Sequence, residues 1–190
     1  KIKSNSIDVF NDSKKSDMSS LNKLRQINQS ILSDENKLNY KLKEFDLLNN
    51  IESKEFPIYF LRLNQRGGIQ SFYETGNRLV YTSKKDYLDW LSRLEQFSQN
   101  INTSLEINKK GLANKITQPK LVTEAVIAQI SAILESDIEN NPYMKVFLEA
   151  DENILSSNEK NSLIEQAKKL ILNKINPAYK QLNNFLIKEY

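Results

Sequence analysis

The chain has 190 residues, 39% of them hydrophobic, and a formal net charge of +3 from 27 basic and 24 acidic side chains. This length suits one domain or part of a larger protein, and the scattered charges lack the basic stripe of a nucleic-acid-binding surface. The sequence has neither cysteine nor histidine, which excludes disulfides, thiolate chemistry and the commonest zinc ligand and general base within this chain. No apolar run reaches the about 18 residues of a membrane-spanning helix.

The N-terminal segment, residues 1–19, consists mainly of Ser, Asn, Lys and Asp with a few apolar residues. Such a composition buries little surface, so we predict a flexible lead-in here and a helical domain over 20–190. Because the first residue is Lys rather than Met, we expect the sequence to begin after a removed leader or at an artificial boundary.

Two amphipathic helices are predicted next, over about 20–32 and 34–53. Ser33 is a typical N-cap residue, and the two acidic residues that follow it suit the positive end of the second helix. Apolar residues at helical spacing form one stripe on each helix: Leu24, Ile27 and Ile31 on the first, and Leu38, Leu42, Phe45 and Leu48 on the second. Because the join is short, we expect the two helices to pack antiparallel.

The stretch over 56–77 differs from the rest of the chain and reads FPIYFLRLNQRGGIQSFYETGN. It holds three of the four glycines, and Pro57 ends the preceding helix. The apolar residues in 58–63 are compatible with a short strand, although no partner strand is evident in the sequence. We therefore predict one glycine-containing irregular loop within an otherwise helical protein.

The candidate binding residues are Gln65, Arg66, Gly67 and Gly68, at the centre of this loop. A glycine pair beside polar side chains lets a backbone approach a ligand closely, so in the functional interpretation these residues line a cleft. The alternative interpretation is an ordinary tight turn, which the pattern alone favours because glycine pairs mark turns far more often than sites. We predict no catalytic residue and no metal ligand in the chain.

Three helical segments are predicted further along the chain. The first begins at Thr82 or Ser83, where Ser83 and Asp86 have the spacing of a capping box, and it ends near Asn114. The second begins around Pro119, because proline is tolerated in the first turn of a helix. A short helix over about 142–150 follows.

The last predicted helix begins at Ser156, which forms a capping box with Glu159, and runs to the C-terminus with a kink or break at Pro177. Its apolar face continues to the final residue, so we expect the natural protein to continue beyond it. If the faces over 163–175 and 179–186 normally pack on a missing half, the isolated chain should expose a large apolar patch. The whole pattern predicts an all-α, antiparallel multi-helix bundle.

Four short motifs follow one another from the loop to the C-terminus: LNQRGG, DYLDWLSRL, GLANKITQPK and PAYKQLNNFLIKEY. In order and spacing they resemble the motifs LPINQxxG, DYxxWLxRL, GIxxGxTxPK and PAYxxLxxFLxxEY of a bacterial family labelled domain of unknown function 885. The resemblance covers about 57–190. One departure is Lys115, which stands where the family often has the second glycine of its third motif, so the turn there is expected to differ.

The resemblance implies a longer helical protein of bacteria, often secreted or lipid-anchored and hence periplasmic or in the cell envelope, with a cytoplasmic location left open. The later half of family members carries a His-Glu motif with further histidines, which implies relatives of zinc metallopeptidases. In such a site histidines hold the metal and the glutamate activates its water. Zinc is thus implied for the parent protein and no cofactor for this chain.

Two hypotheses follow from the resemblance. In the first, the chain is the N-terminal helical portion of a zinc-dependent peptidase-like protein, and Gln65, Arg66, Gly67 and Gly68 form one wall of its substrate cleft. Its partners are then the missing C-terminal catalytic half and a peptide substrate. In the second, the chain is a non-catalytic helical interaction or scaffold module. Neither hypothesis involves nucleic acid or a transmembrane segment.

Overall fold

A computed structural model describes residues 6–190, and within that range every regular element is helical. The predicted all-α class is therefore confirmed. The long helices are α1 (Ile7–Arg25), α2 (Asp34–Ser53), α4 (Lys84–Ala113), α5 (Lys120–Glu135), α7 (Ser157–Leu170) and α8 (Asn176–Lys188). The short ones are α3 (Tyr73–Arg78), α6 (Lys145–Leu148), the 3-10 turns η1 (Gln29–Ile31), η2 (Ile58–Phe60), η3 (Ile69–Ser71) and η4 (Ile138–Asn140), and the π-helical turn η5 (Ile171–Ile175).

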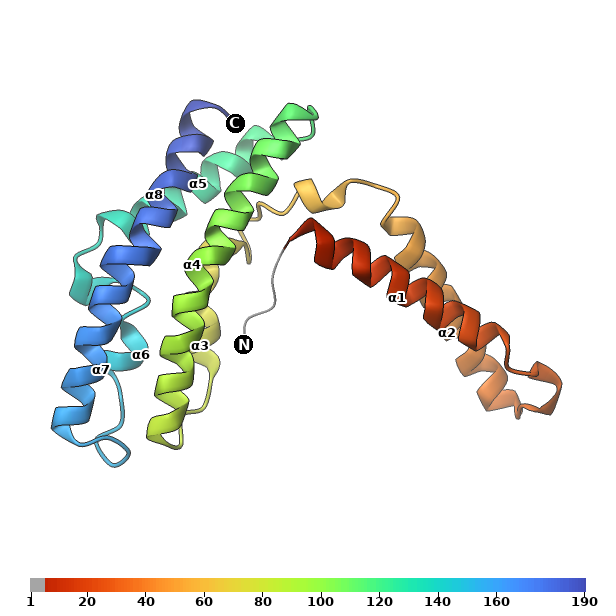
Figure 1. The fold of residues 1–190 in the computed structure, drawn as a ribbon, viewed down its shortest axis with the longest axis horizontal. Helices are drawn as coiled ribbons and strands as arrows, with labels where there is room; N and C mark the ends of the chain where they lie inside the picture. Colours follow the sequence, from red (N-terminus) through yellow and green to blue (C-terminus); the bar gives the residue numbers. More distant parts are fainter. Residues whose placement is uncertain (1–5) are drawn as a thin grey trace.

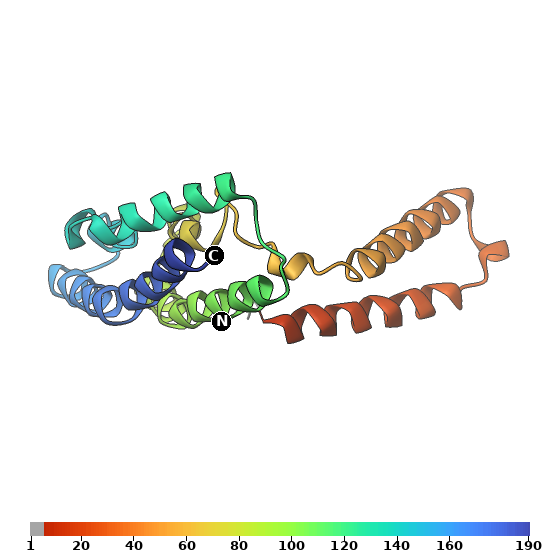
Figure 2. The ribbon, with the colours of Figure 1, turned by 90° about the horizontal axis from the view of Figure 1, so that it is seen from above.

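The molecule has two visibly different parts (Figure 1). Helices α3 to α8 form a bundle, which we call the body. Helices α1 and α2 form an antiparallel hairpin, which we call the arm, and it extends away from one end of the body (Figure 2). No helix among residues 6–190 combines the length and the apolar character that crossing a membrane requires.

The main hydrophobic cluster lies in the body, where α8 packs against both α4 and α5. Its largest fully buried side chains include Trp90, Phe97, Tyr143, Phe147 and Tyr179. The apolar faces over 163–175 and 179–186, considered above for a missing half, are buried within this chain: Leu163, Ala167, Ile171, Ile175, Tyr179, Leu182 and Phe185 are all below 5% exposed. These two faces therefore do not form an exposed patch.

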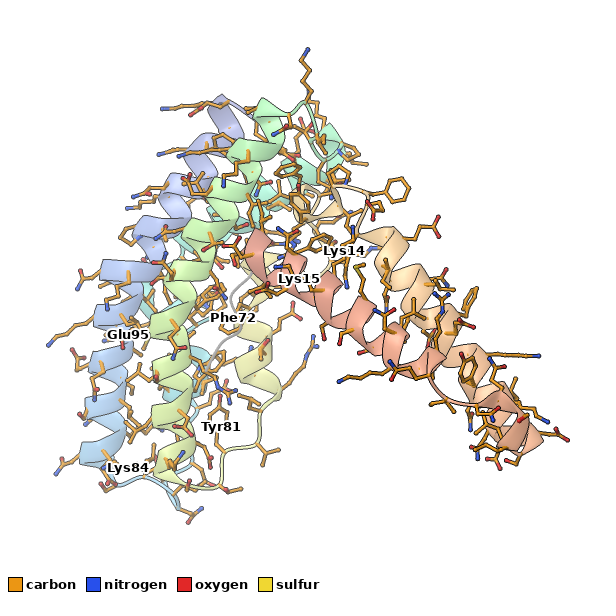
Figure 3. All side chains as sticks on the ribbon, turned by 45° about the vertical axis from the view of Figure 1, so that its right-hand side comes forward. Lys14, Lys15, Phe72, Tyr81, Lys84 and Glu95 are labelled. Atoms are coloured by element: carbon orange, nitrogen blue, oxygen red, sulfur yellow. The ribbon has the colours of Figure 1, made fainter. Side chains whose placement is uncertain are left out.

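Within the segment predicted as a flexible lead-in, α1 begins at Ile7; residues 1–5 of that prediction lie outside the described residues. The helix also ends earlier than expected, at Arg25. Although 7–19 is polar, the helix that contains it packs against α2. Ion pairs join α1 to α2 and to the turn that directly follows α2: Lys14 with Glu55 (2.5 Å), Lys54 with Asp17, and Arg25 with Glu44 (2.9 Å); Lys14 is labelled in Figure 3.

Helix α2 begins and ends where the sequence predicts. The Ser33 hydroxyl accepts a hydrogen bond from the Asn36 N–H (3.3 Å), so the predicted N-cap is confirmed. The antiparallel packing is also confirmed, but the buried residues of α2 are Tyr40 and Leu47. Leu38, Leu42 and Phe45 lie on the opposite side of the helix, Leu48 lies on its flank, and all four are exposed.

Downstream, the two predicted capping boxes are both present, at Ser83 with Asp86 and at Ser156 with Glu159. The predicted break near Pro177 takes the form of the π-helical turn η5, which ends just before α8. A proline cannot donate a backbone hydrogen bond, and the wider turn accommodates that loss.

Candidate functional site

Residues 64–71, which we call the glycine loop, fold around the carbonyl oxygen of Asn64. This oxygen accepts hydrogen bonds from the Gly68 N–H (2.9 Å) and from Nε2 of Gln70 (2.8 Å). The Asn64 side chain accepts a third bond, from the Arg66 N–H to Oδ1 (2.9 Å). The short strand with which 58–63 is compatible does not form, because η2 occupies the start of that segment. The expected irregular stretch also ends before 77, since α3 begins at Tyr73.

Two helices of the body hold the glycine loop in place. Gln129 of α5 accepts a bond from Nε2 of Gln70 (2.7 Å) and donates one from its own Nε2 to the Gln65 carbonyl (2.9 Å). On the other side, the Tyr179 hydroxyl of α8 donates to the Ile69 carbonyl (2.9 Å). Side chains thus provide hydrogen-bond partners for backbone carbonyls that no helix satisfies. These bonds fix the position of the loop although it is not helical.

The two loop glycines have different roles. At Gly68 a Cβ atom would lie 2.5 Å from both the Asn64 carbonyl oxygen and Oε1 of Gln70, so only glycine fits this turn. At Gly67 a Cβ atom would meet nothing within 4 Å, and this residue is exposed. Gly68 is therefore explained by the turn, whereas Gly67 leaves bare backbone open to solvent.

Two hollows adjoin the glycine loop, with volumes of about 410 Å³ and about 320 Å³. Arg66, Ser71 and Glu74 line both of them. Gly67 and Gly68 line the larger hollow, and Gln65 lines the smaller one. The four residues predicted from sequence are therefore brought together along one surface.

The floor of the larger hollow is aromatic. The ring of Phe72 stacks on Phe97 of α4 with centroids 4.1 Å apart, and on Trp90 at 5.4 Å. Figure 3 shows Phe72 beside α4, where it fixes the end of the loop on the core. The hollow therefore combines an apolar floor with a charged rim.

The rim carries two arginines and one carboxylate. Nη2 of Arg78 donates to Oε2 of Glu74 at 2.5 Å, so these two charges offset each other. Arg66 is exposed, and among residues 6–190 no ion pair involves its side chain. The unpaired guanidinium presents a forked set of donors that matches a carboxylate geometrically.

Hollows of similar volume occur elsewhere on the body, at about 430 Å³ between α4 and α7 and about 460 Å³ beside Tyr190. Volume therefore does not distinguish the hollows at the glycine loop from the others. The groups that line them do, because exposed glycine backbone and the unpaired guanidinium of Arg66 lie together there, next to aromatic rings.

A buried pair of tyrosines lies behind the loop. The hydroxyls of Tyr143 and Tyr179 are 2.7 Å apart, and Tyr179 uses its hydrogen for the Ile69 carbonyl, so Tyr143 is the donor between them. Burial is the main cause that raises the pKa of each phenol above its ordinary value, and the neighbouring Tyr179 adds to the effect on Tyr143. Both stay protonated at neutral pH and act as hydrogen-bonding supports rather than as acids or bases.

The described residues do not fit a zinc site. Among residues 6–190 no group of three or more carboxylate, histidine or cysteine side chains is close enough to hold a metal ion. Zinc prefers nitrogen and sulfur ligands, and this sequence has no histidine or cysteine. No reaction step in this chain is therefore assigned to a metal.

Sequence reasoning missed three residues that hold the loop: Gln70, Gln129 and Tyr179. Gln129 and Tyr179 lie on helices far along the chain, so no local pattern connects them with the loop. Gln70 offered a weak signal as a polar residue next to a glycine pair, and it is 1% exposed. Its Oε1 is buried without a hydrogen-bond partner, beside the position that any Gly68 side chain would occupy.

The third motif of the resemblance ends helix α4 as a Schellman motif. The N–H of Ile116 bonds to the Gly111 carbonyl (2.9 Å) and that of Lys115 to the Leu112 carbonyl (2.9 Å). Lys115 has φ 61°, the left-handed conformation that glycine adopts most readily. Lysine therefore occupies a backbone position that glycine adopts most readily, at the place where the family motif often has glycine.

Comparison with known proteins agrees with these motifs. The family model described as "Bacterial protein of unknown function (DUF885)" matches residues 4–190. Neither the curated proteins nor the solved structures give a match. Because the family match spans nearly the whole sequence, the chain belongs to the DUF885 family of bacterial proteins of unknown function.

Proposed function

We propose that this chain is the N-terminal helical portion of a zinc-dependent peptidase-like protein and that its glycine loop forms one wall of a peptide-binding cleft. The observation that carries the proposal is the unpaired Arg66 guanidinium beside exposed Gly67 backbone, over the aromatic floor at Phe72. In this proposal the catalytic half that carries the metal is a separate, C-terminal portion, and the protein works in the bacterial cell envelope.

The chain's own residues would bind and orient the peptide. Arg66 would hold a carboxylate of the peptide through a forked pair of hydrogen bonds. Gly67, which has no side chain, would let the peptide backbone come close, and Gln65 would offer its amide from the neighbouring hollow. None of these groups is suited to transfer a proton at neutral pH, so the wall would lower the free energy of substrate binding without taking part in bond cleavage.

The anchoring of the glycine loop supports a role in peptide binding, because the groups of a binding surface must be held close to a single geometry. Gln129 and Tyr179 fix the loop from two sides through the carbonyls of Gln65 and Ile69. Arg66 lies between these two anchored carbonyls. The backbone of Arg66 is therefore held in position, while its exposed side chain can still move to contact a ligand.

A binding experiment on this chain tests the wall directly. The probe is the tripeptide Ala-Ala-Glu, and the control probe is Ala-Ala-Gln with an amidated C-terminus, which has no carboxylate. We expect NMR shift changes at amides in 65–75 with the acidic peptide only. Arg66→Ala should abolish them, whereas Lys120→Ala, which removes an exposed cation far from the loop, should leave them unchanged. Equal shifts with both peptides, or binding that survives Arg66→Ala, would contradict the proposal.

A second experiment concerns the parent protein. Full-length protein should hydrolyse peptides with zinc bound, and Arg66→Ala should raise KM with kcat nearly unchanged, the sign of binding lost equally in the ground and transition states. Unchanged KM would exclude Arg66 from the cleft.

The second candidate function is a helical interaction or scaffold module without a peptide cleft. The observation that favours it is the row of large apolar side chains left exposed along α2. A full-length protein without peptidase activity, together with a glycine loop that binds neither peptide, would favour this alternative.

A further inference from the structure

The outward side of α2 carries several large apolar side chains that the fold leaves uncovered. Leu38, Leu42 and Phe45 are 58%, 55% and 63% exposed, and Leu48 is exposed beside them. We call Leu38, Leu42, Phe45 and Leu48 the arm stripe. Single exposed apolar residues are ordinary, but a contiguous row marks a surface that associates with another one.

The arm stripe cannot be covered by the arm itself. Tyr40 and Leu47 are the residues that α2 buries against α1. At 3.6 residues per turn they lie roughly 140° to 180° around the helix from Leu38 and Phe45. The arm also extends away from the body (Figure 1), so the stripe is open along its whole length.

The charges beside the stripe indicate what fits it. Lys41 and Glu52 are exposed, and neither forms an ion pair with any residue in 6–190. They are separated by about three helical turns, so they lie on the same side of α2, between Phe45 and Leu48 around the helix. A helix that runs antiparallel to α2 needs an acidic residue opposite Lys41 and a basic residue opposite Glu52. Helix α2 itself, reversed, has this pattern.

We propose that two copies of this chain pair through their arm stripes, with the two α2 helices antiparallel about a two-fold axis. When Lys41 of one copy faces Glu52 of the other, the axis crosses α2 between Asp46 and Leu47. In the same register, Phe45 of each copy lies opposite Leu48 of the other copy, so this contact occurs twice at the centre of the interface. Such a contact is isologous, so it closes at two copies and does not propagate into a filament.

The size of the face determines how tight the dimer should be. A helix of 20 residues is about 30 Å long and about 10 Å wide with its side chains. Two such faces bury less than the roughly 1,200 Å² at which stable interfaces begin. We therefore expect reversible association in the micromolar range, with a monomer at high dilution.

Sedimentation velocity over a series of micromolar concentrations tests the proposal on the full chain. Wild-type protein should shift from monomer to dimer as concentration rises, and Phe45→Glu should remain a monomer. Leu172→Glu is the matched control, because it charges an apolar side chain that is 52% exposed on the body. It should dimerise like wild type, and circular dichroism should show that both variants remain helical.

Charge reversal tests the register. Lys41→Glu and Glu52→Lys should each weaken the dimer about tenfold, because each replaces two attractive contacts by two repulsive ones. Combined in one chain, the two substitutions should restore the wild-type dissociation constant.

Three results would each overturn the proposal: a monomer at every concentration, a dimer unaffected by Phe45→Glu, or a double variant whose dimer is no tighter than those of the single variants. In the first case the stripe would serve a different protein. Because none of these readouts involves peptide binding, the result is independent of the proposed cleft.

Discussion

Gln129 and Gln70 share a hydrogen bond of 2.7 Å that joins helix α5 to the glycine loop across 59 residues of sequence. The same Gln129 side chain donates to the Gln65 carbonyl, so one residue supports the loop at two points. Because Gln70 is buried, the loss of its partner leaves a polar group poorly satisfied away from water.

Gln129→Leu should therefore lower the free energy of unfolding by about 1–2 kcal/mol. Hydrogen exchange of the amides in 64–71 should rise more than exchange elsewhere in the body. Gln166→Leu is the matched control, since its Nε2 bonds only within its own exposed helix, to Ser162. Urea unfolding and exchange mass spectrometry measure both effects. Equal losses in the two variants would mean that Gln129 does not anchor the loop.

Gly76 of α3 lies against the indole of Trp90, and a Cβ atom there would be 2.3 Å from the Cζ2 atom of the ring. Gly76→Ala should destabilise the protein by about 1–3 kcal/mol, because a fully buried tryptophan in a packed core has little room to move. Gly67→Ala is the control, since a methyl group at that position meets nothing within 4 Å. Thermal unfolding of the two variants should differ clearly, and similar melting temperatures would contradict the packing described for Trp90.

The elements that the sequence predicts best are those whose signals are local. The caps at Ser33, Ser83 and Ser156 have their hydrogen-bond partners three residues away, so the pattern contains the whole interaction. The glycine loop is different. Its position followed from the glycine pair, but its anchors at Gln129 and Tyr179 are distant in sequence, and only the packing of α5 and α8 brings them to it.

The arm shows where pattern reasoning fails. The stripe at Leu38, Leu42 and Phe45 has the spacing of a buried helix face, yet α2 buries Tyr40 and Leu47 instead. Periodicity tells that a face is apolar and cannot tell which surface covers it. Similarly, 7–19 is too polar to suggest a helix, and its ion-pair partners, such as Glu55, are distant in sequence, in the turn that follows α2.

Lys115 has a left-handed backbone conformation, with φ 61°, at the end of α4. This conformation costs a residue with a Cβ atom about 1 kcal/mol relative to glycine. Lys115→Gly should therefore raise the free energy of unfolding by up to about 1 kcal/mol. Lys110→Gly, inside the last turn of the same helix, should lower it by about 0.5–1 kcal/mol. Chemical denaturation checks both, and a loss of stability in Lys115→Gly would indicate that the lysine side chain itself contributes to the turn.

Glu159 makes one end of α7 sensitive to acid. Hydrogen bonds from Lys84 (2.9 Å) and from the side chain and backbone N–H of Ser156 lower the pKa of its carboxyl to about 2, below its ordinary value of about 4.5. Because the folded pKa is the lower one, the contribution to stability is complete above the unfolded pKa and is lost as pH falls from about 4.5 towards 2.

Glu159→Gln should thus reduce the melting temperature at pH 7, and the difference from wild type should shrink steadily below pH 4.5. Asp86, whose pKa is lowered by bonds from Thr82 and Ser83, stays unchanged in both proteins and cancels from the comparison. A difference that stays constant between pH 7 and pH 2 would show that the carboxylate charge of Glu159 does not stabilise the cap.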